Sequence, residues 1–269
     1  MSGFKLDYTA SEINARLAQA GKAVCYNILD NSDFRNPVNQ RGDPSYSGAK
    51  YTIDRWESNS GYGVVTVNSG YINFKSSNGN AVYMQQFIES KVIKSGSPYT
   101  VACTLKDGSV HCIDGIASTS MTEAIRYIYV NNANVGTIRF KYDSGNSCYL
   151  VMFSTSLTSG IDIVNASLYE GAFTSETLPY YNPKGFGVEL AECMRYYQKI
   201  RVLAGSTASA AQRQFISLPV EMRATPTVSH EVVDGAAPSA LSARDNKTID
   251  ITAASSNHSH VWVMMTADL

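Results

Sequence analysis

The feature that most constrains the fold of this chain is the repeated alternation of strand-like runs and turn-forming stretches over about residues 25–181. Short runs of β-branched and aromatic residues, such as 63–67, 99–105, 125–130 and 148–153, are separated by turn-forming stretches. No helical periodicity lies between them. Strands of this length and spacing are typical of antiparallel β-sandwiches and jelly rolls. We therefore expect an all-β fold for this part of the chain.

The faces of individual strands can also be assigned. In 137–142, Ile138 and Phe140 share one face and Arg139 lies on the other, which indicates a strand with one buried and one wetted side. In 148–153 both faces are apolar. We therefore expect the latter strand to lie in the centre of a sheet.

One helix is expected near the start of the chain, over residues 8–22. Ile13, Leu17 and Ala20 recur at helical spacing and form a narrow apolar stripe. A stripe of this width cannot bury itself, so the helix is expected to pack on the next domain or on copies of itself.

Beyond residue 181 the pattern changes again. Residues 182–187, Asn-Pro-Lys-Gly-Phe-Gly, indicate a linker, and residues 188–194 suit one or two helical turns. Tyr196 and Tyr197 fall on opposite faces of the strand that follows, so at most one of them is expected in the core. Strands are expected at 195–202, 214–218, 227–232, 248–252 and 261–265.

These patterns divide the chain into three parts. We expect an N-terminal connector helix (1–23), a jelly-roll or β-sandwich domain (24–181) and a smaller C-terminal β-sandwich (182–269). The last part is small for a stable monomer without a disulfide, which favours assembly into an oligomer.

The composition excludes several kinds of partner. Only 17% of residues are charged, the 22 basic and 23 acidic residues nearly balance, and no basic run occurs. Nucleic acid is therefore not expected as a partner, because phosphate binding needs clustered Lys and Arg. No apolar stretch is long enough to insert into a membrane, and Met1 to Ala10 lack the apolar core of a signal peptide. The 17 tyrosines favour a binding surface, since Tyr gives rigid contact area and a hydroxyl.

The five cysteines match no metal-binding spacing, and their number is odd. Cys103 and Cys112 are close enough in sequence to face each other across a hairpin. Five free thiols, folded in a reducing cytoplasm, are the favoured interpretation.

The sequence carries no recognisable catalytic motif. It has neither a glycine-rich phosphate loop nor a nucleophile elbow. Glycosidase chemistry needs two converging carboxylates, and the acids of one early polar stretch cannot be paired from the sequence. These acids are Asp30, Asp33, Asp43, Asp54 and Glu57. Roles in turns and helix caps are favoured for them, so we expect neither enzymatic activity nor a cofactor.

Aromatic residues supply the candidate ligand-binding positions. Tyr46, Tyr62 and Tyr71 lie in Gly-, Ser- and Asn-rich surroundings and are expected to form an exposed aromatic platform. Trp56 follows an Arg and could stack on a sugar ring, but a core anchor whose N–H is satisfied by backbone is the favoured role.

His258 and His260 form the sharpest local pattern for a metal. On a strand they point to the same side, and in an oligomer they could ring a transition metal. Two histidines alone do not define a metal site, so a polar strand is the favoured interpretation and no metal is assigned.

Several stretches resemble a known group of proteins. Residues 27–34, 36–42 (Asn-Pro-Val-Asn-Gln-Arg-Gly) and 51–56 (Tyr-Thr-Ile-Asp-Arg-Trp) are similar to the opening of carbohydrate-binding-module-like jelly rolls in phage and prophage tail proteins. Residues 189–199 and 218–228 are similar to the distal domain of phage tail fibres and receptor-binding proteins. The N-terminal helix resembles the segment that joins such tips to the fibre.

This resemblance implies a homotrimeric fibre tip that recognises a bacterial surface polysaccharide. It would be made in the bacterial cytoplasm and act outside the cell as part of the virion tail, bound to other tail proteins through its N-terminal helix. The shared motifs form the fold and supply no ligand residues, which moves Trp56 further from a binding role. Two alternatives stay open: a glycan depolymerase or esterase on the same scaffold, and a purely structural tail or baseplate component.

Overall fold

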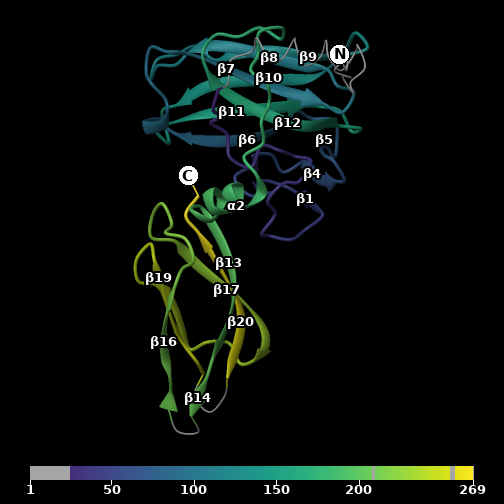
Figure 1. Ribbon diagram of the computed structural model, residues 1–269. Helices are drawn as coiled ribbons and strands as arrows, with labels where there is room; N and C mark the ends of the chain where they lie inside the picture. Colours follow the sequence, from purple (N-terminus) through teal and green to yellow (C-terminus); the bar gives the residue numbers. More distant parts are fainter. Residues whose placement is uncertain (1–24, 208–209, 255–257, 269) are drawn as a thin grey trace, which may run out of the picture.

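The computed structural model describes residues 25–207, 210–254 and 258–268. About 50% of the structure is strand and 5% is helix, which confirms the expected all-β class. Figure 1 shows two β regions joined by a segment that contains helix α2 (Phe186–Met194). The helix expected over 8–22 lies outside the described residues. No helix in the described part is long and apolar enough to cross a membrane.

The first β region consists of two six-stranded antiparallel sheets that share one core. A short 3₁₀ turn, η1, spans Ser90–Val92. Sheet A contains, in spatial order, β1 (Ser45–Ser47), β4 (Gly63–Asn68), β5 (Tyr71–Ser76), β12 (Ile161–Glu170), β7 (Pro98–Leu105) and β8 (Val110–Ile116). Sheet B contains β2 (Lys50–Tyr51), β3 (Glu57–Ser58), β6 (Val82–Glu89), β11 (Cys148–Thr155), β10 (Ala133–Asp143) and β9 (Ala124–Val130).

Trp56 anchors the core of this sandwich. Its side chain is fully buried, and its ring centroid lies 5.3 Å from that of Phe34 and 5.8 Å from that of Phe153. The indole N–H donates to the carbonyl oxygen of Asn31 at 2.9 Å. The predicted core role of Trp56, with its N–H satisfied by backbone, is confirmed.

The strand faces follow the alternation in the sequence. Ile138 and Phe140 are fully buried on the inner face of β10, whereas Arg139 is partly exposed on the outer face. β11 pairs with β6 on one side and β10 on the other, and all of its residues are buried. The central position predicted for 148–153 is therefore confirmed.

The second β region has a core of its own, built on alternate residues of its central strand. Val261, Val263 and Met265 are fully buried there. In this region the sequence analysis misses the strands at 206–207, 210–211 and 240–243. One sheet contains β13 (Tyr197–Ala204), β20 (Ser259–Thr266) and β17 (Thr227–Gly235); the next contains β16 (Arg213–Ser217), β19 (Thr248–Thr252) and β18 (Ala240–Ala243); β14 (Ser206–Thr207) pairs with β15 (Ala210–Ala211).

Polar side chains join the two β regions. Arg41 Nη1 lies 3.0 Å from Asp54 Oδ1, and Arg41 Nη2 lies 3.4 Å from Asp268 Oδ2 near the end of the chain. Gln40 Nε2 donates to Asp54 Oδ2 at 2.7 Å and to the carbonyl oxygen of Tyr197 at 2.8 Å. Because these contacts link residues of the early loop to the start of β13 and to the residues after β20, they fix the two regions against each other.

The expectation that at most one of Tyr196 and Tyr197 is buried is wrong. Both are more than nine-tenths buried. Arg55 Cζ lies 3.5 Å from the ring centroid of Tyr196, and Arg41 Cζ lies 3.9 Å from that of Tyr197. Each ring is covered by an arginine of the first β region, so opposite faces of the chain are both buried at this junction.

All five cysteines are free thiols, in agreement with the favoured interpretation of the sequence. The alternative pairing across a hairpin does not occur. Cys103 is opposite His111, and Cys112 is opposite Ala102. In this register Cys103 faces the core and Cys112 faces outward, so the two thiols lie on opposite faces of the sheet.

Candidate functional site

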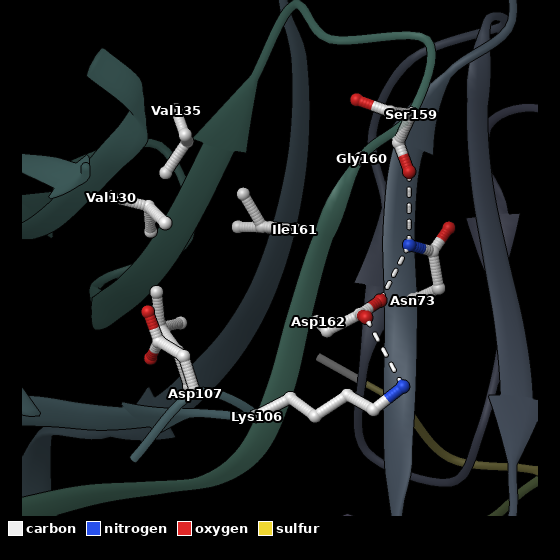
Figure 2. A pocket seen from close by; sticks show the side chains of 10 residues that line it. Asn73, Lys106, Asp107, Val130, Val135, Ser159, Gly160, Ile161 and Asp162 are labelled. Atoms are coloured by element: carbon white, nitrogen blue, oxygen red, sulfur yellow. Dashed lines mark hydrogen bonds and ion pairs between the residues drawn. The ribbon is translucent and has the colours of Figure 1, made fainter. Parts of the chain in front are cut away.

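A cavity of about 470 Å³ opens at one end of the first β region, where the turns after β7, β9 and β11 meet (Figure 2). We call it the mouth pocket. Its volume lies in the range of small-ligand sites. It is lined by Asn73, Leu105, Lys106, Asp107, Val130, Val135, Ser159, Gly160, Ile161 and Asp162.

Apolar side chains from both sheets line one side of the mouth pocket. Leu105 and Ile161 come from strands of sheet A, and Val130 and Val135 come from the β9–β10 hairpin of sheet B. These residues belong to the core of the sandwich or pack against it. Part of the apolar core therefore lines the cavity at this end and can make apolar contacts with a ligand.

Polar groups held by one another form the rim of the pocket (Figure 2). Asn73 and Asp162 are opposite each other in the β5–β12 pairing. Asn73 Nδ2 donates to Asp162 Oδ1 at 2.7 Å and to the carbonyl oxygen of Ser159 at 3.1 Å. Lys106 Nζ lies 3.7 Å from Asp162 Oδ2. The Asp162 carboxylate is thus fixed by two neighbours.

Asp107 lies in the tight turn between β7 and β8. Within that turn, the amide of Gly108 donates to the carbonyl oxygen of Leu105 at 2.9 Å. The backbone N–H and the hydroxyl of Ser109 both donate to Asp107 Oδ1, at 2.9 and 2.6 Å. These bonds stabilise the charged form and lower the pKa of Asp107. Asp107 is therefore an ionised acceptor at neutral pH, with Oδ2 left for a ligand.

The three tyrosines expected to form a platform do not lie together. Tyr71 lies beside the pocket, with Lys106 Nζ 3.9 Å from its ring centroid. Tyr62 is 50% exposed but does not line the pocket. Tyr46 is only 2% exposed, so its expected place on an exposed platform is wrong. It lies opposite Val65 on the core side of sheet A, and its hydroxyl donates to the side chain of Asn39.

No protein-family model, curated protein or solved structure matches this chain. The function must therefore be argued from the geometry of the site. The sequence analysis does not single out Asn73, Asp107 or Asp162. Residues 106–108, Lys-Asp-Gly, indicate a turn, and nothing in the sequence shows that this turn meets the start of β12.

The two histidines considered as metal ligands have other partners. His258 precedes β20, and its Nε2 lies 3.1 Å from Asp234 Oδ2. His260 Nε2 accepts a hydrogen bond from Arg201 Nε at 2.6 Å. Within the described residues, no group of three or more His, Cys, Asp or Glu side chains is placed to hold a metal ion.

The carboxylates with raised pKa values lie away from the mouth pocket. Burial raises the pKa of Asp54 and of Asp268 to about 6 and that of Glu189 to about 7. All three lie at the junction of the two β regions. Of the other early acids, Asp30 forms ion pairs with Arg55 and Lys184, and Asp33 forms an ion pair with Arg35. Both carboxylates therefore have structural roles.

Proposed function

We propose that this chain binds a bacterial cell-surface glycan in the mouth pocket, as a phage-type tail fibre receptor-binding protein. The proposal rests on one observation: a preformed cavity that combines an apolar wall with carboxylate, amide and ammonium groups at fixed positions. Sugars present apolar C–H faces and many hydroxyls, and such a lining suits both. The Asp107 and Asp162 carboxylates would accept hydrogen bonds from sugar hydroxyls, and Asn73 and Lys106 would keep Asp162 in place.

The phage-type setting rests on the sequence resemblance of 27–56 and 189–228. A jelly-roll assignment for the first β region is supported by its two six-stranded antiparallel sheets, in which consecutive strands repeatedly change sheet. The same setting implies that the protein is incorporated into the virion tail and contacts other tail proteins through its N-terminal segment.

A homotrimer completes the proposal. In the β13–β20–β17 sheet, Arg201 and Glu231 both lie opposite Trp262, so the two edge strands carry opposite charges on the same face. Both side chains are exposed. A head-to-tail contact that places the β17 edge of one copy beside the β13 edge of the next would bring these opposite charges together, and it would form a trimer if the rotation between copies closes a three-membered ring. Light scattering should then give three times the 29.3 kDa chain mass, and a monomer would count against this part of the proposal.

The first experiment is binding of the wild type and Asp107→Asn to an array of bacterial surface polysaccharides. We expect wild-type binding and at least about tenfold weaker binding by Asp107→Asn, because the amide replaces an acceptor by a donor. Asp143→Asn is the matched control, since Asp143 also accepts turn N–H groups but lies outside the pocket. Wild-type strength in Asp107→Asn would contradict the site, and no binding by the wild type would contradict the function.

A depolymerase or esterase on the same scaffold is the second candidate. A glycosidase needs one carboxyl that stays protonated, whereas the pKa of Asp107 is lowered. We therefore expect no new reducing ends and no released acyl groups when a bound polysaccharide is incubated with the protein. Their appearance would favour the enzyme. A purely structural tail component would instead be incorporated into virions without binding any glycan.

A further inference from the structure

Two more hollows lie on the outer face of sheet A, beneath a strap formed by residues 171–181. Their volumes are about 260 and 340 Å³. Both are lined by Val110 of β8 and by Ser175 of the strap, so they form one continuous groove. We call it the strap groove.

The strap is fixed to the sheet, so the groove exists before any ligand binds. The amide of Gly171 donates to the carbonyl oxygen of Pro98 at 2.8 Å. Thr100 Oγ1 donates to the carbonyl oxygen of Gly171 at 2.8 Å and accepts from the amide of Phe173 at 2.9 Å. Leu178 is buried against the outward-facing Tyr169 cluster. A preformed groove avoids the entropy cost of ordering a loop on binding.

The groove combines aromatic walls with free polar groups. Tyr180 lines one wall of the groove and is 59% exposed. Tyr181 lies beside it, and Arg35 Cζ is 5.8 Å from the centroid of the Tyr181 ring. The floor includes the Asn165 amide and the Thr104 hydroxyl. Among the described residues, neither of these two side chains has a hydrogen-bond partner. Stacking surfaces beside unpaired amide and hydroxyl groups suit an extended sugar chain.

The strap groove lies next to the mouth pocket along one segment of the chain. Thr104 lines the groove and Lys106 lines the pocket, and both face outward on the same strand-and-turn segment. Outward residues two apart on a strand are separated by about 7 Å. The amide of Lys106 donates to the carbonyl oxygen of Asp162 at 3.0 Å, which fixes the turn after β7 against the start of β12.

The charges along this path disfavour an acidic ligand. Three cations line the pocket and groove, and one of them, Arg35, is already paired with Asp33. Lys106 lies beside Asp162. Like charges brought together cost binding energy, so a polymer of uronic acids or phosphates is a poor fit. The carboxylates that line the path are Asp107, Asp114, Asp162 and Glu176.

We infer that the strap groove and the mouth pocket form one track that binds several consecutive residues of a linear polysaccharide, neutral or amino-substituted. The inference rests on the proposed glycan binding and specifies its ligand class. A terminal residue would occupy the mouth pocket, and the preceding residues would lie against Tyr180 and Asn165.

The test uses the full chain and a length series. The probe is the neutral or amino-substituted polysaccharide with the strongest array signal, cleaved by mild acid and separated from disaccharide to octasaccharide. We expect the dissociation constant to fall at least about tenfold along this series for the wild type. Tyr180→Ala and Asn165→Ala should lose this gain in affinity with length. Tyr129→Ala, at a 52% exposed tyrosine outside the groove, is the matched control and should keep the gain.

The contrary outcomes are separable. Equal affinity for all lengths, with unchanged binding by Tyr180→Ala, would overturn the track while leaving the mouth pocket intact. Array binding confined to acidic polysaccharides would overturn the assigned ligand class. No array binding at all would overturn the proposed function itself.

Discussion

Gly160 is the residue on which the shape of the mouth pocket most depends. Its φ is +80°, a conformation that L side chains rarely adopt. A Cβ there would lie 2.6 Å from the backbone oxygen of Phe74 and 2.7 Å from Lys75 Cβ. The loop can therefore pass close over β5, where the Ser159 carbonyl meets the Asn73 amide, only without a side chain.

We expect Gly160→Ala to lower the free energy of unfolding by about 2–4 kcal/mol, since backbone strain and a clash add. Gly79→Ala is the control, because Gly79 has φ +84° but open space around its Cβ position. It should cost about 1 kcal/mol, from strain alone. Urea denaturation of both variants measures the difference. Equal losses would show that the close approach at Gly160 contributes nothing.

At the scale of strands, the β9–β10 hairpin brings Val130 and Val135 to the pocket. The register of this pair shifts between Asn134 and Gly136, which marks a bulge. A Cβ on Gly136 would lie 2.2 Å from the carbonyl oxygen of Ser154 on β11. Glycine at this position allows the bulged strand to stay paired with its neighbour.

Gly136→Ala should therefore force β10 away from β11 and destabilise the protein by about 2–4 kcal/mol. Gly145→Ala is the comparison, because Gly145 has a negative φ and only a distant contact with the Asp143 side chain. We expect the latter change to stay within about 0.5 kcal/mol. Thermal unfolding monitored by circular dichroism would report both, and a Gly136→Ala midpoint equal to the wild type would contradict the steric argument.

The elements also show where sequence reasoning succeeds and where it stops. The faces of β10 and β11 could be predicted because alternation is a local property. The position of Tyr46 could not, since its polar neighbours in sequence say nothing of Val65 across the sheet. The mouth pocket likewise brings together Asn73, Asp107 and Asp162 through strand pairing between distant segments, and a single sequence does not encode that pairing visibly.

At the scale of the whole molecule, two buried carboxylates at the junction of the two β regions pair with the same arginine. Arg41 is shared between Asp54 and Asp268, whose side chains are 0% and 7% exposed. Asp268 Oδ1 is buried and has no hydrogen-bond partner among the described residues. One cation between two buried carboxylates leaves a net negative charge when both are ionised, and burial makes this charge costly.

Stability should therefore fall as the pH rises through the folded pKa values of these acids. Burial raises the pKa of Asp54 and of Asp268 from 3.8 to about 6, so the folded state binds more protons than the unfolded state between about pH 4 and pH 6. The resulting stabilisation is complete below the unfolded pKa and is lost above the folded one. We expect the free energy of unfolding to decrease by about 4 kcal/mol between pH 4.5 and pH 7.5, about 2 kcal/mol from each carboxylate.

Chemical denaturation across this range, with Asp268→Asn beside the wild type, tests the assignment. The amide stays neutral at every pH, so the slope should become shallower and the difference between variant and wild type should be most favourable to the variant at pH 7.5. Acids whose pKa is lowered do not mimic the effect, because the pKa of Glu89 falls to about 2 and its contribution is lost only at lower pH. A wild type whose stability rises from pH 4.5 to pH 7.5 would mean that Arg41 and solvent fully compensate both carboxylates.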